Sequence, residues 1–196
     1  MQAHTTEHQF HFPTDWKSIY DRIQAIDPIK YASTRNFENG ALTLLGPYIS
    51  RGVISTKFVF EHVNSLDLEW KSTEKLVQEL AWRDYWQQIW VEKHNQIESD
   101  LNFEQKEVLH SRVPAAIVEA NTGIEAIDAA IDNFYKTGYL HNHMRMYIAA
   151  ICCNIGKYHW SAPAKWMYAN LLDGDLASNH LSWQWVAGTF SNRKYV

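Results

Sequence analysis

The residues best suited to chemistry lie together near the end of the chain, in the stretch LLDGDLASNHLSWQW. Carboxylates occur at Asp173 and Asp175, an amide at Asn179, and indoles at Trp183 and Trp185. Carboxylates accept hydrogen bonds and pair with cations, whereas an amide hydrogen-bonds without supplying charge. Indoles bury large areas, so core filling is the ordinary explanation for any one of the nine Trp residues. Their positions therefore decide more than their number.

Two more groups of side chains share helix faces, because positions three and four apart lie on the same side of a helix. The groups are Glu79, Trp82, Arg83 and Trp86, and Asn142, Arg145, Met146 and Ala149. Solvated faces seldom carry Trp, Met and Asn together. A binding surface is the favoured interpretation of both groups, over a solvated face with a stray indole.

The elements that must position these residues are helices, because apolar residues recur at helical spacing and almost nowhere alternate as in strands. Helices are predicted over residues 15–26, 55–63, 72–94, 124–137, 142–160 and 162–172. Thr122 and Glu125 form an expected capping box before the fourth of these, and Gly138 closes it. Turns around one short helix are expected over residues 31–55, and a surface loop with one short helical piece over 95–121. The predicted fold class is all-α.

Composition favours one domain, since 46% of the 196 residues are hydrophobic and can form a sizeable core. The net charge of -4 excludes a global positive field, so contact with DNA must rest on a local basic patch. The candidates for that patch are Arg51, Lys157, Arg193 and Lys194. Adjacent Cys152 and Cys153 suit a reducing compartment, and no segment resembles a signal peptide or a membrane span. We expect a cytoplasmic protein with no membrane partner.

Several motifs in register resemble the flavin-binding helical domain of the photolyase/cryptochrome family. They are ELAWRDY (79–85), TGIEAIDAAI (122–131), GYLHNHMRM (138–146) and DGDLASNHLSWQW (173–185), with a weaker match in LTLLGPYISRGVIS (42–55). The resemblance predicts an FAD-binding helical domain over residues 31–196 and an N-terminal extension with one helix over residues 1–30. The family's α/β antenna domain has no counterpart, so no second chromophore is expected. A partner protein that replaces this domain is left open.

The resemblance implies FAD in a folded conformation, with its adenine close to its isoalloxazine. The residues that match the family's cofactor contacts are Tyr31, Thr43, Glu79, Arg83, Asn142, Arg145, Asp173, Asp175 and Asn179. Of these, Arg83 matches the arginine at the pyrophosphate, and Tyr31 and Thr43 match contacts on the phosphate side.

The other matches lie around the flavin. Arg145 and Asp173 match an ion pair over the ring system, which is the kind of pair that destabilises a protein when it is broken. Asp175 matches a residue at the polar edge of the rings. Asn179 matches the residue that faces flavin N5, where an amide hydrogen-bonds without supplying charge.

Trp183 and Trp160 match the first two members of the family's chain of aromatic residues for light-driven electron transfer. The third member would fall within EQKEVLHSR (104–112), which contains no Trp. Photoreduction by three tryptophans is therefore not expected, and Tyr158 or Tyr147 is a candidate substitute.

A third set of matches belongs to the pocket that holds a flipped pyrimidine dimer in DNA-repairing members. The set comprises Glu79, Trp82, Asn142, Met146 and Trp185. Trp82 and Trp185 match the flat walls of that pocket, and Glu79 matches a group that hydrogen-bonds, and can protonate, a base carbonyl. The resulting prediction is light-driven electron transfer from reduced FAD to pyrimidine dimers in DNA, as in a deoxyribodipyrimidine photo-lyase. The alternatives are a cryptochrome-like light or redox sensor without repair activity, and a degenerate FAD-binding module.

Two departures from the family weaken the expected binding. Its phosphate loop carries Thr-Ser followed by Ser-Pro, whereas this chain has Leu42-Thr43 and Gly46-Pro47, so hydroxyl donors are lost. With the net acidity, DNA binding is expected to be weak, to single-stranded or lesion-containing DNA. No metal site is expected, because His141 and His143 point apart on a helix and no third ligand accompanies them.

Overall fold

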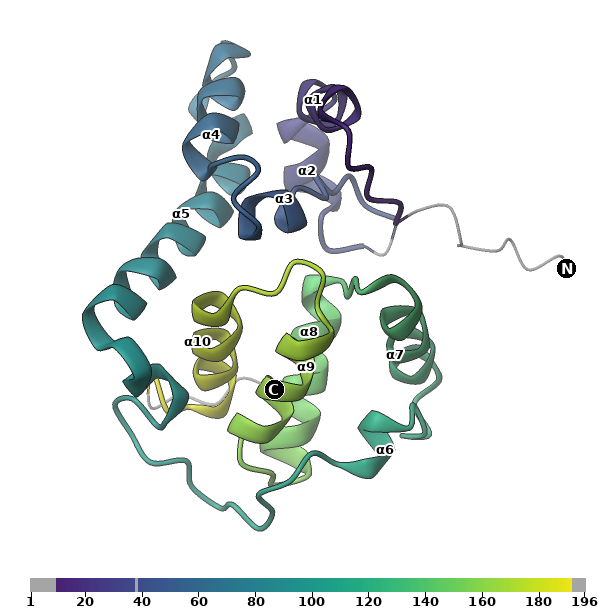
Figure 1. Cartoon of the computed structure of the whole chain (residues 1–196), viewed down its shortest axis with the longest axis vertical. Coiled ribbons are helices and arrows are strands. Elements are labelled where there is room, and N and C mark those ends of the chain that lie inside the picture. Colours follow the sequence, from purple (N-terminus) through teal and green to yellow (C-terminus); the bar gives the residue numbers. More distant parts are fainter. Residues whose placement is uncertain (1–9, 38, 192–196) are drawn as a thin grey trace, which may run out of the picture. The chain divides into compact units, whose positions relative to one another are not determined.

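The structure is a computed structural model that describes residues 10–37 and 39–191. Its first elements are α1 (Trp16–Gln24), α2 (Pro28–Thr34), α3 (Gly46–Ser50), α4 (Thr56–Ser65), α5 (Trp70–Lys93) and the short η2 (His94–Glu98). They are followed by α6 (Ala115–Val118), α7 (Glu125–Thr137), α8 (Asn142–Ala150), η3 (Ile151–Ile155), α9 (Ser161–Asn170) and α10 (Leu176–Ala187) (Figure 1). The described residues form no strand, only one isolated bridge between His110 and Tyr158. The predicted all-α class is confirmed.

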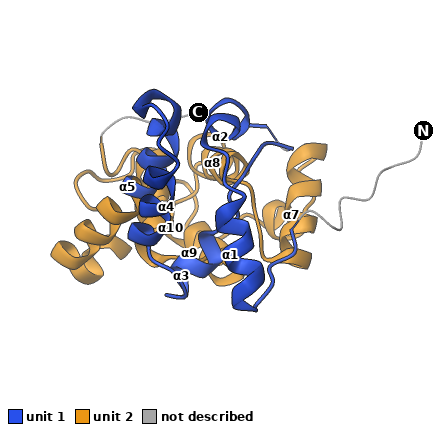
Figure 2. Cartoon of the chain, turned by 90° about the horizontal axis from the view of Figure 1, so that it is seen from above, with its two compact units in different colours: residues 1–81 blue, residues 82–196 orange. Residues whose placement is uncertain are grey.

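The chain consists of two compact units, residues 1–81 and residues 82–196, coloured separately in Figure 2. In the first unit, an apolar core joins α1, α3, α4 and the start of α5 through side chains such as Ile23, Tyr48 and Val59. The second unit has a larger core around Trp160 and Trp183, and a smaller one around Trp86. The proposed division at residue 30 stays a prediction.

Side-chain caps explain where several helices begin. Asp15 accepts a hydrogen bond from Ser18 N at the start of α1, and Ser55 accepts one from Phe58 N at the start of α4. Such caps satisfy backbone N–H groups that have no partner within the helix. Gly138 ends α7 with a φ of 67°, as predicted, because glycine adopts this left-handed conformation without strain.

The predicted capping box is wrong. Ile124 is the N-cap of α7 and offers no side-chain cap. The Asp128 carboxylate accepts hydrogen bonds from Thr122 N (2.8 Å), Thr122 Oγ1 (2.6 Å) and Gly123 N (3.1 Å). These bonds hold the pKa of Asp128 below its usual value. The acidic side chain that stabilises this turn is therefore Asp128, three residues after Glu125.

The predicted helix over 142–160 is also shorter than expected. After α8, the chain forms a single π-helical segment, η3, and Gly156 follows as its C-cap. Lys157 then has a φ of 57°, which stops the helical course of the chain. Between residues 31 and 55, the structure has the end of α2 and the whole of α3 where one short helix was expected.

Helix α10 lies at the centre of the second unit, in contact with both α8 and α9 (Figure 1). Its buried side chains are Ala177, Asn179, His180, Leu181, Trp183, Gln184, Val186 and Ala187, whereas Ser182 is exposed and Ser178 and Trp185 are partly buried. A helix with so much of its surface buried belongs largely to the interior of a domain. The loop before α10 and the start of α10 therefore present their polar groups from a rigid support.

Candidate functional site

Asp175 organises the start of α10. Its Oδ1 accepts a hydrogen bond from Ser178 N at 2.7 Å, which makes Asp175 the N-cap. Its Oδ2 accepts another from Gln87 Nε2 of α5 at 2.6 Å. The same carboxylate therefore begins one helix and fastens another to it. Gln87 is a site residue that sequence reasoning missed.

Arg83 lies close to this carboxylate but does not hydrogen-bond to it. Its Nη2 is 3.8 Å from Asp175 Oδ2, and the side chain is only 18% exposed. That nitrogen is buried and has no hydrogen-bond partner among the described residues. Ser178 Oγ, in the first turn of α10, is likewise buried and has no hydrogen-bond partner among those residues. A buried guanidinium nitrogen and a buried hydroxyl without partners leave donors free for an anionic or polar ligand.

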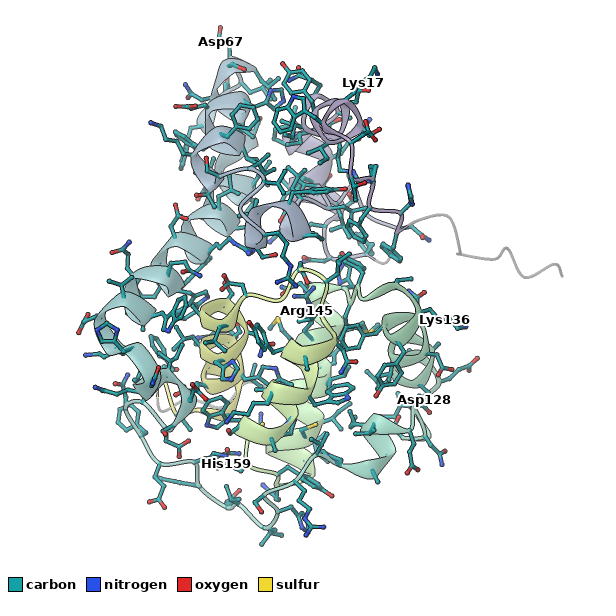
Figure 3. The ribbon with its side chains drawn as sticks, in the orientation of Figure 1. Lys17, Asp67, Asp128, Lys136, Arg145 and His159 are labelled. Carbon is teal, nitrogen blue, oxygen red and sulfur yellow. The ribbon has the colours of Figure 1, made fainter. Side chains whose placement is uncertain are left out.

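Arg145 and Asp173 form a close ion pair in the second unit. Arg145 Nη2 lies 2.8 Å from Asp173 Oδ1 and 2.9 Å from Oδ2, and Arg145 Nε donates to Leu140 O at 2.8 Å. Figure 3 shows Arg145 on α8, close to the chain that leads into α10. Burial raises the pKa of the neighbouring Tyr139 to about 12, which marks the surroundings as poorly hydrated. The pairing of Arg145 with Asp173 expected from the sequence is present in the geometry.

Asn179 is buried in α10 and fixed to a neighbouring helix. Its Nδ2 donates to Ala164 O of α9 at 2.9 Å. The next residue, His180, is 1% exposed, and its Nε2 has no hydrogen-bond partner among the described residues. Its ring meets Trp160 edge to face, with the two centroids 5.8 Å apart.

His180 gives the fold a pH dependence. Burial lowers the pKa of His180 from its usual value of 6.5; the nearby Glu98 opposes this shift and Lys165 adds to it. Because the unfolded chain takes up this proton first, the free energy of unfolding should fall as the pH drops from 6.5 toward the lowered pKa. Above 6.5, this residue should contribute no slope.

Urea unfolding at a series of pH values on both sides of 6.5 measures this effect. The control is His180→Gln, which keeps a polar side chain but cannot titrate. An equal slope in the wild type and the variant would contradict the assignment to His180.

The four indoles singled out in the sequence differ in exposure. Trp160 and Trp183 belong to the core and are 0% and 2% exposed. Trp82 is 51% exposed and stacks on buried Trp86 at a centroid distance of 5.4 Å. Trp185 is partly buried and packs against the main core. Trp82 therefore offers a flat surface that is held in place from behind.

The remaining predicted contacts of the dimer pocket lie on α5 and α8. Glu79 precedes Trp82 by three residues on α5 and is exposed. Asn142 begins α8 and is exposed, while Met146, one turn later, is half-buried. Their assignment to a dimer pocket stays a prediction.

The first unit contains a pocket of about 260 Å³ that includes both predicted phosphate-side residues. Its lining residues are Arg22, Ala25, Ile26, Asp27, Lys30, Tyr31, Ala41, Leu42, Thr43 and Leu44. Tyr31 and Thr43 are thus brought together from separate segments of the chain. Two cations, Arg22 and Lys30, join them and were missed in the sequence. Cations are the donors that a phosphate needs where hydroxyl groups have been lost.

The basic residues proposed for DNA contact are only partly described. Arg51 is exposed in the first unit, and Lys157 in the second unit pairs with Glu107 at 2.6 Å. Arg193 and Lys194 lie outside the described residues. Across the residues that the structure describes, no helix is long and apolar enough to cross a membrane.

Comparison with known proteins gives a consistent family signal. Residues 76–196 match the family model described as the FAD binding domain of DNA photolyase. A deoxyribodipyrimidine photo-lyase of Streptomyces griseus is 30% identical over 79% of this chain and 35% of its own length. A cryptochrome DASH of Danio rerio is 28% identical over 84% of this chain and 34% of its own length. The chain thus spans about a third of the length of these relatives.

Solved structures agree on the fold. A cryptochrome from Synechocystis sp. PCC6803 superposes with a TM-score of 0.81 at 23% identity, covering 94% of this chain and 41% of that one. A photolyase from Sulfolobus tokodaii, solved with two FAD molecules, superposes with a TM-score of 0.77 at 21% identity over 94% and 42% of the two chains.

Proposed function

Because the chain belongs to the family of the FAD-binding domain of DNA photolyase, we propose that it uses FAD and light to transfer an electron to pyrimidine dimers in DNA. The observation that carries the proposal is the arrangement on α5. An exposed indole, Trp82, directly precedes Arg83, whose side chain is largely buried and has one nitrogen with no hydrogen-bond partner in the described part of the chain. One side chain suits a flat base, and the other suits the anionic part of a cofactor.

FAD is the cofactor of this domain, and the residues present fit it. The buried Arg83 Nη2 and Ser178 Oγ have no protein partner among the described residues, which is unfavourable unless a ligand hydrogen-bonds to them. When bound, FAD supplies the light absorption and the one-electron chemistry. The pocket that contains Tyr31 and Thr43 adds cationic and hydroxyl groups in the first unit.

The chain's own residues bind and orient in this proposal. Arg83 provides a cation for the cofactor's phosphates, with Asp175 holding its position from 3.8 Å. Arg145 and Asp173 present a neutralised pair to the flavin, so that neither side chain adds net charge next to the rings. Asn179 keeps its amide oxygen for flavin N5, because its nitrogen is already bonded to Ala164 O.

The dimer would meet side chains of a different kind. Lesion repair requires an extruded base to leave the duplex stack and to rest on flat apolar walls with a few polar anchors. Trp82 offers such a wall, Trp185 is proposed as the second, and Glu79 as the hydrogen-bonding anchor. Met146 and Asn142 complete the proposed set.

The test is repair of an oligonucleotide that contains a cyclobutane pyrimidine dimer by purified, FAD-loaded and chemically reduced protein, with and without blue light. We expect dimer loss only in the light. Trp82→Ala should weaken binding to the oligonucleotide by about tenfold, since base–aromatic stacking contributes ~1–3 kcal/mol. Its FAD content should be unchanged. The matched control is Trp70→Ala, a similarly exposed indole at the start of α5.

Two other outcomes would reject repair. Oxidised FAD that is reduced by light in a parallel sample, without any dimer loss in the repair assay, would identify a light or redox sensor. Properly folded protein that binds FAD but shows no light response would identify a module without photochemistry.

A further inference from the structure

The buried indole of Trp160 is hydrogen-bonded to a carboxylate that the proposed function does not yet use. Trp160 Nε1 donates to Asp100 Oδ1 at 2.7 Å, and the indole is 0% exposed. Asp100 lies just after η2, sixty residues earlier in the chain. Indole N–H groups need only one acceptor, and a backbone carbonyl or a water would satisfy them. An anionic acceptor is an uncommon choice for a side chain in an apolar core.

The carboxylate is held in this position from several sides. Asp100 Oδ2 accepts a hydrogen bond from Gln105 N at 2.7 Å. The Gln105 side chain in turn bonds to Trp160 N (2.9 Å) and Tyr158 O (2.9 Å), so the loop and the start of α9 are fastened together. His159 Nε2 lies 3.2 Å from Asp100 Oδ1. The acceptor and the indole are therefore held in a fixed mutual geometry.

The same contacts lead from the buried indole toward solvent. Asp100 and His159 have side chains that are 19% and 32% exposed. His159 lies at the entry to α9, as Figure 3 shows. A proton that reaches Asp100 is thus one contact from a side chain with access to water.

We propose that Asp100 accepts the indole proton of Trp160 when that residue is oxidised, so that Trp160 ends the electron-transfer chain. The inference rests on the proposed function and on the match of Trp183 to the first member of the family's electron-transfer chain, from which Trp183 is expected to give one electron to light-excited oxidised FAD. Trp160 then gives one electron to Trp183 and restores it. The loss of an electron makes the indole N–H strongly acidic, and its proton moves across the hydrogen bond to the Asp100 carboxylate. The products are a neutral Trp160 radical, a protonated Asp100 and FAD reduced by one electron.

This step explains how charge separation survives without a third tryptophan. The segment 104–112, where a third indole would be expected, contains none. A neutral radical lacks the positive charge that draws the electron back, and it must regain its proton before it can return to the starting state. Deprotonation at the second indole therefore replaces transfer to a more distant one.

Transient absorption of the FAD-loaded protein after a blue laser flash tests the proposal. The wild type should form the neutral tryptophanyl radical, and its decay should slow in D2O. Asp100→Asn keeps the hydrogen-bond acceptor but is a much weaker base, so it should form the cationic radical instead. That radical should recombine about tenfold faster, which corresponds to about 1.4 kcal/mol. The control is Asp132→Asn, which removes an exposed carboxylate from α7 and should behave as the wild type.

A second readout needs neither light nor FAD. In the 15N-labelled apoprotein, the indole N–H of Trp160, assigned with Trp160→Phe, should resonate downfield and exchange slowly, and Asp100→Asn should shift it upfield. A wild-type radical on Trp160 that stays cationic, a radical on Tyr158, or equal kinetics in Asp100→Asn would overturn this inference and leave the proposed function standing. FAD-loaded wild type that forms no radical in the light would overturn both.

Discussion

Replacement of Arg145 with Gln is expected to lower the free energy of unfolding by about 2–3 kcal/mol. The variant leaves the Asp173 carboxylate, only 14% exposed, without the cation that now lies within 2.9 Å of both its oxygens. It also removes the donor to Leu140 O. Fully buried pairs cost more to break, about 3–5 kcal/mol, and the 24% exposure of Arg145 argues for the smaller value.

The measurement is urea unfolding of the apoprotein, analysed as a double-mutant cycle with Asp173→Asn. The double variant should be more stable than Arg145→Gln alone, because no unpaired carboxylate remains. Arg145→Lys is the control that keeps the positive charge. It should lose less stability than Arg145→Gln because Asp173 still has a cation beside it. It should still lose some stability because Lys cannot reproduce the bond to Leu140 O. Additive losses in the cycle would show that the pair is not coupled.

The same variants separate folding from cofactor binding. FAD affinity of Arg145→Gln, measured at a temperature where the protein is folded, should fall because the flavin would face an uncompensated negative charge. The double variant should recover part of that affinity, since both charges are gone. A recovery of stability without a recovery of affinity would mean that the cofactor needs the guanidinium itself.

The sequence could predict the class of fold and much of the site because both rest on local patterns. Helical spacing of apolar residues located most helices, such as α4, which was predicted over residues 55–63 and is found over Thr56–Ser65. Positions three and four apart placed Trp82 and Trp86 on one face of α5, where they stack. The family resemblance then predicted that Arg145 and Asp173 would pair, although nothing in their spacing indicates a contact.

The features that could not be predicted depend on contacts between distant segments. Gln87 bonds to Asp175 across 88 residues, and Asp100 bonds to Trp160 across 60. Gln and Asp are common surface residues, so neither carries a signal in the sequence. The π-helical turn of η3 was missed for another reason: the apolar pattern continues through Cys152 and Cys153, and only the backbone of Gly156 and Lys157 ends it.

Replacement of Asp175 with Ala is the other change with a large expected effect, because one carboxylate serves two helices and a guanidinium. The variant should lose about 1 kcal/mol of stability from the cap of α10 and a similar amount from the bond to Gln87. It also leaves buried Arg83 without the anion 3.8 Å away. Since Arg83 is proposed to bind the phosphates from that position, FAD affinity should fall by about tenfold, or about 1.4 kcal/mol.

Asp175→Asn distinguishes these contributions. Asn is as good an N-cap as Asp, and its amide nitrogen can donate to Gln87 Oε1 once the Gln87 amide turns over, so its unfolding curve should lie close to that of the wild type. Its loss of negative charge should still lower FAD affinity, because Arg83 would lose the anionic partner that holds it in position. Fluorescence titration with FAD and with riboflavin, which has no phosphate, locates the effect: a change for FAD alone points to the phosphates that Arg83 binds. If Asn and Ala lower FAD affinity only in proportion to their loss of stability, Asp175 supports the fold and does not tune the cofactor site.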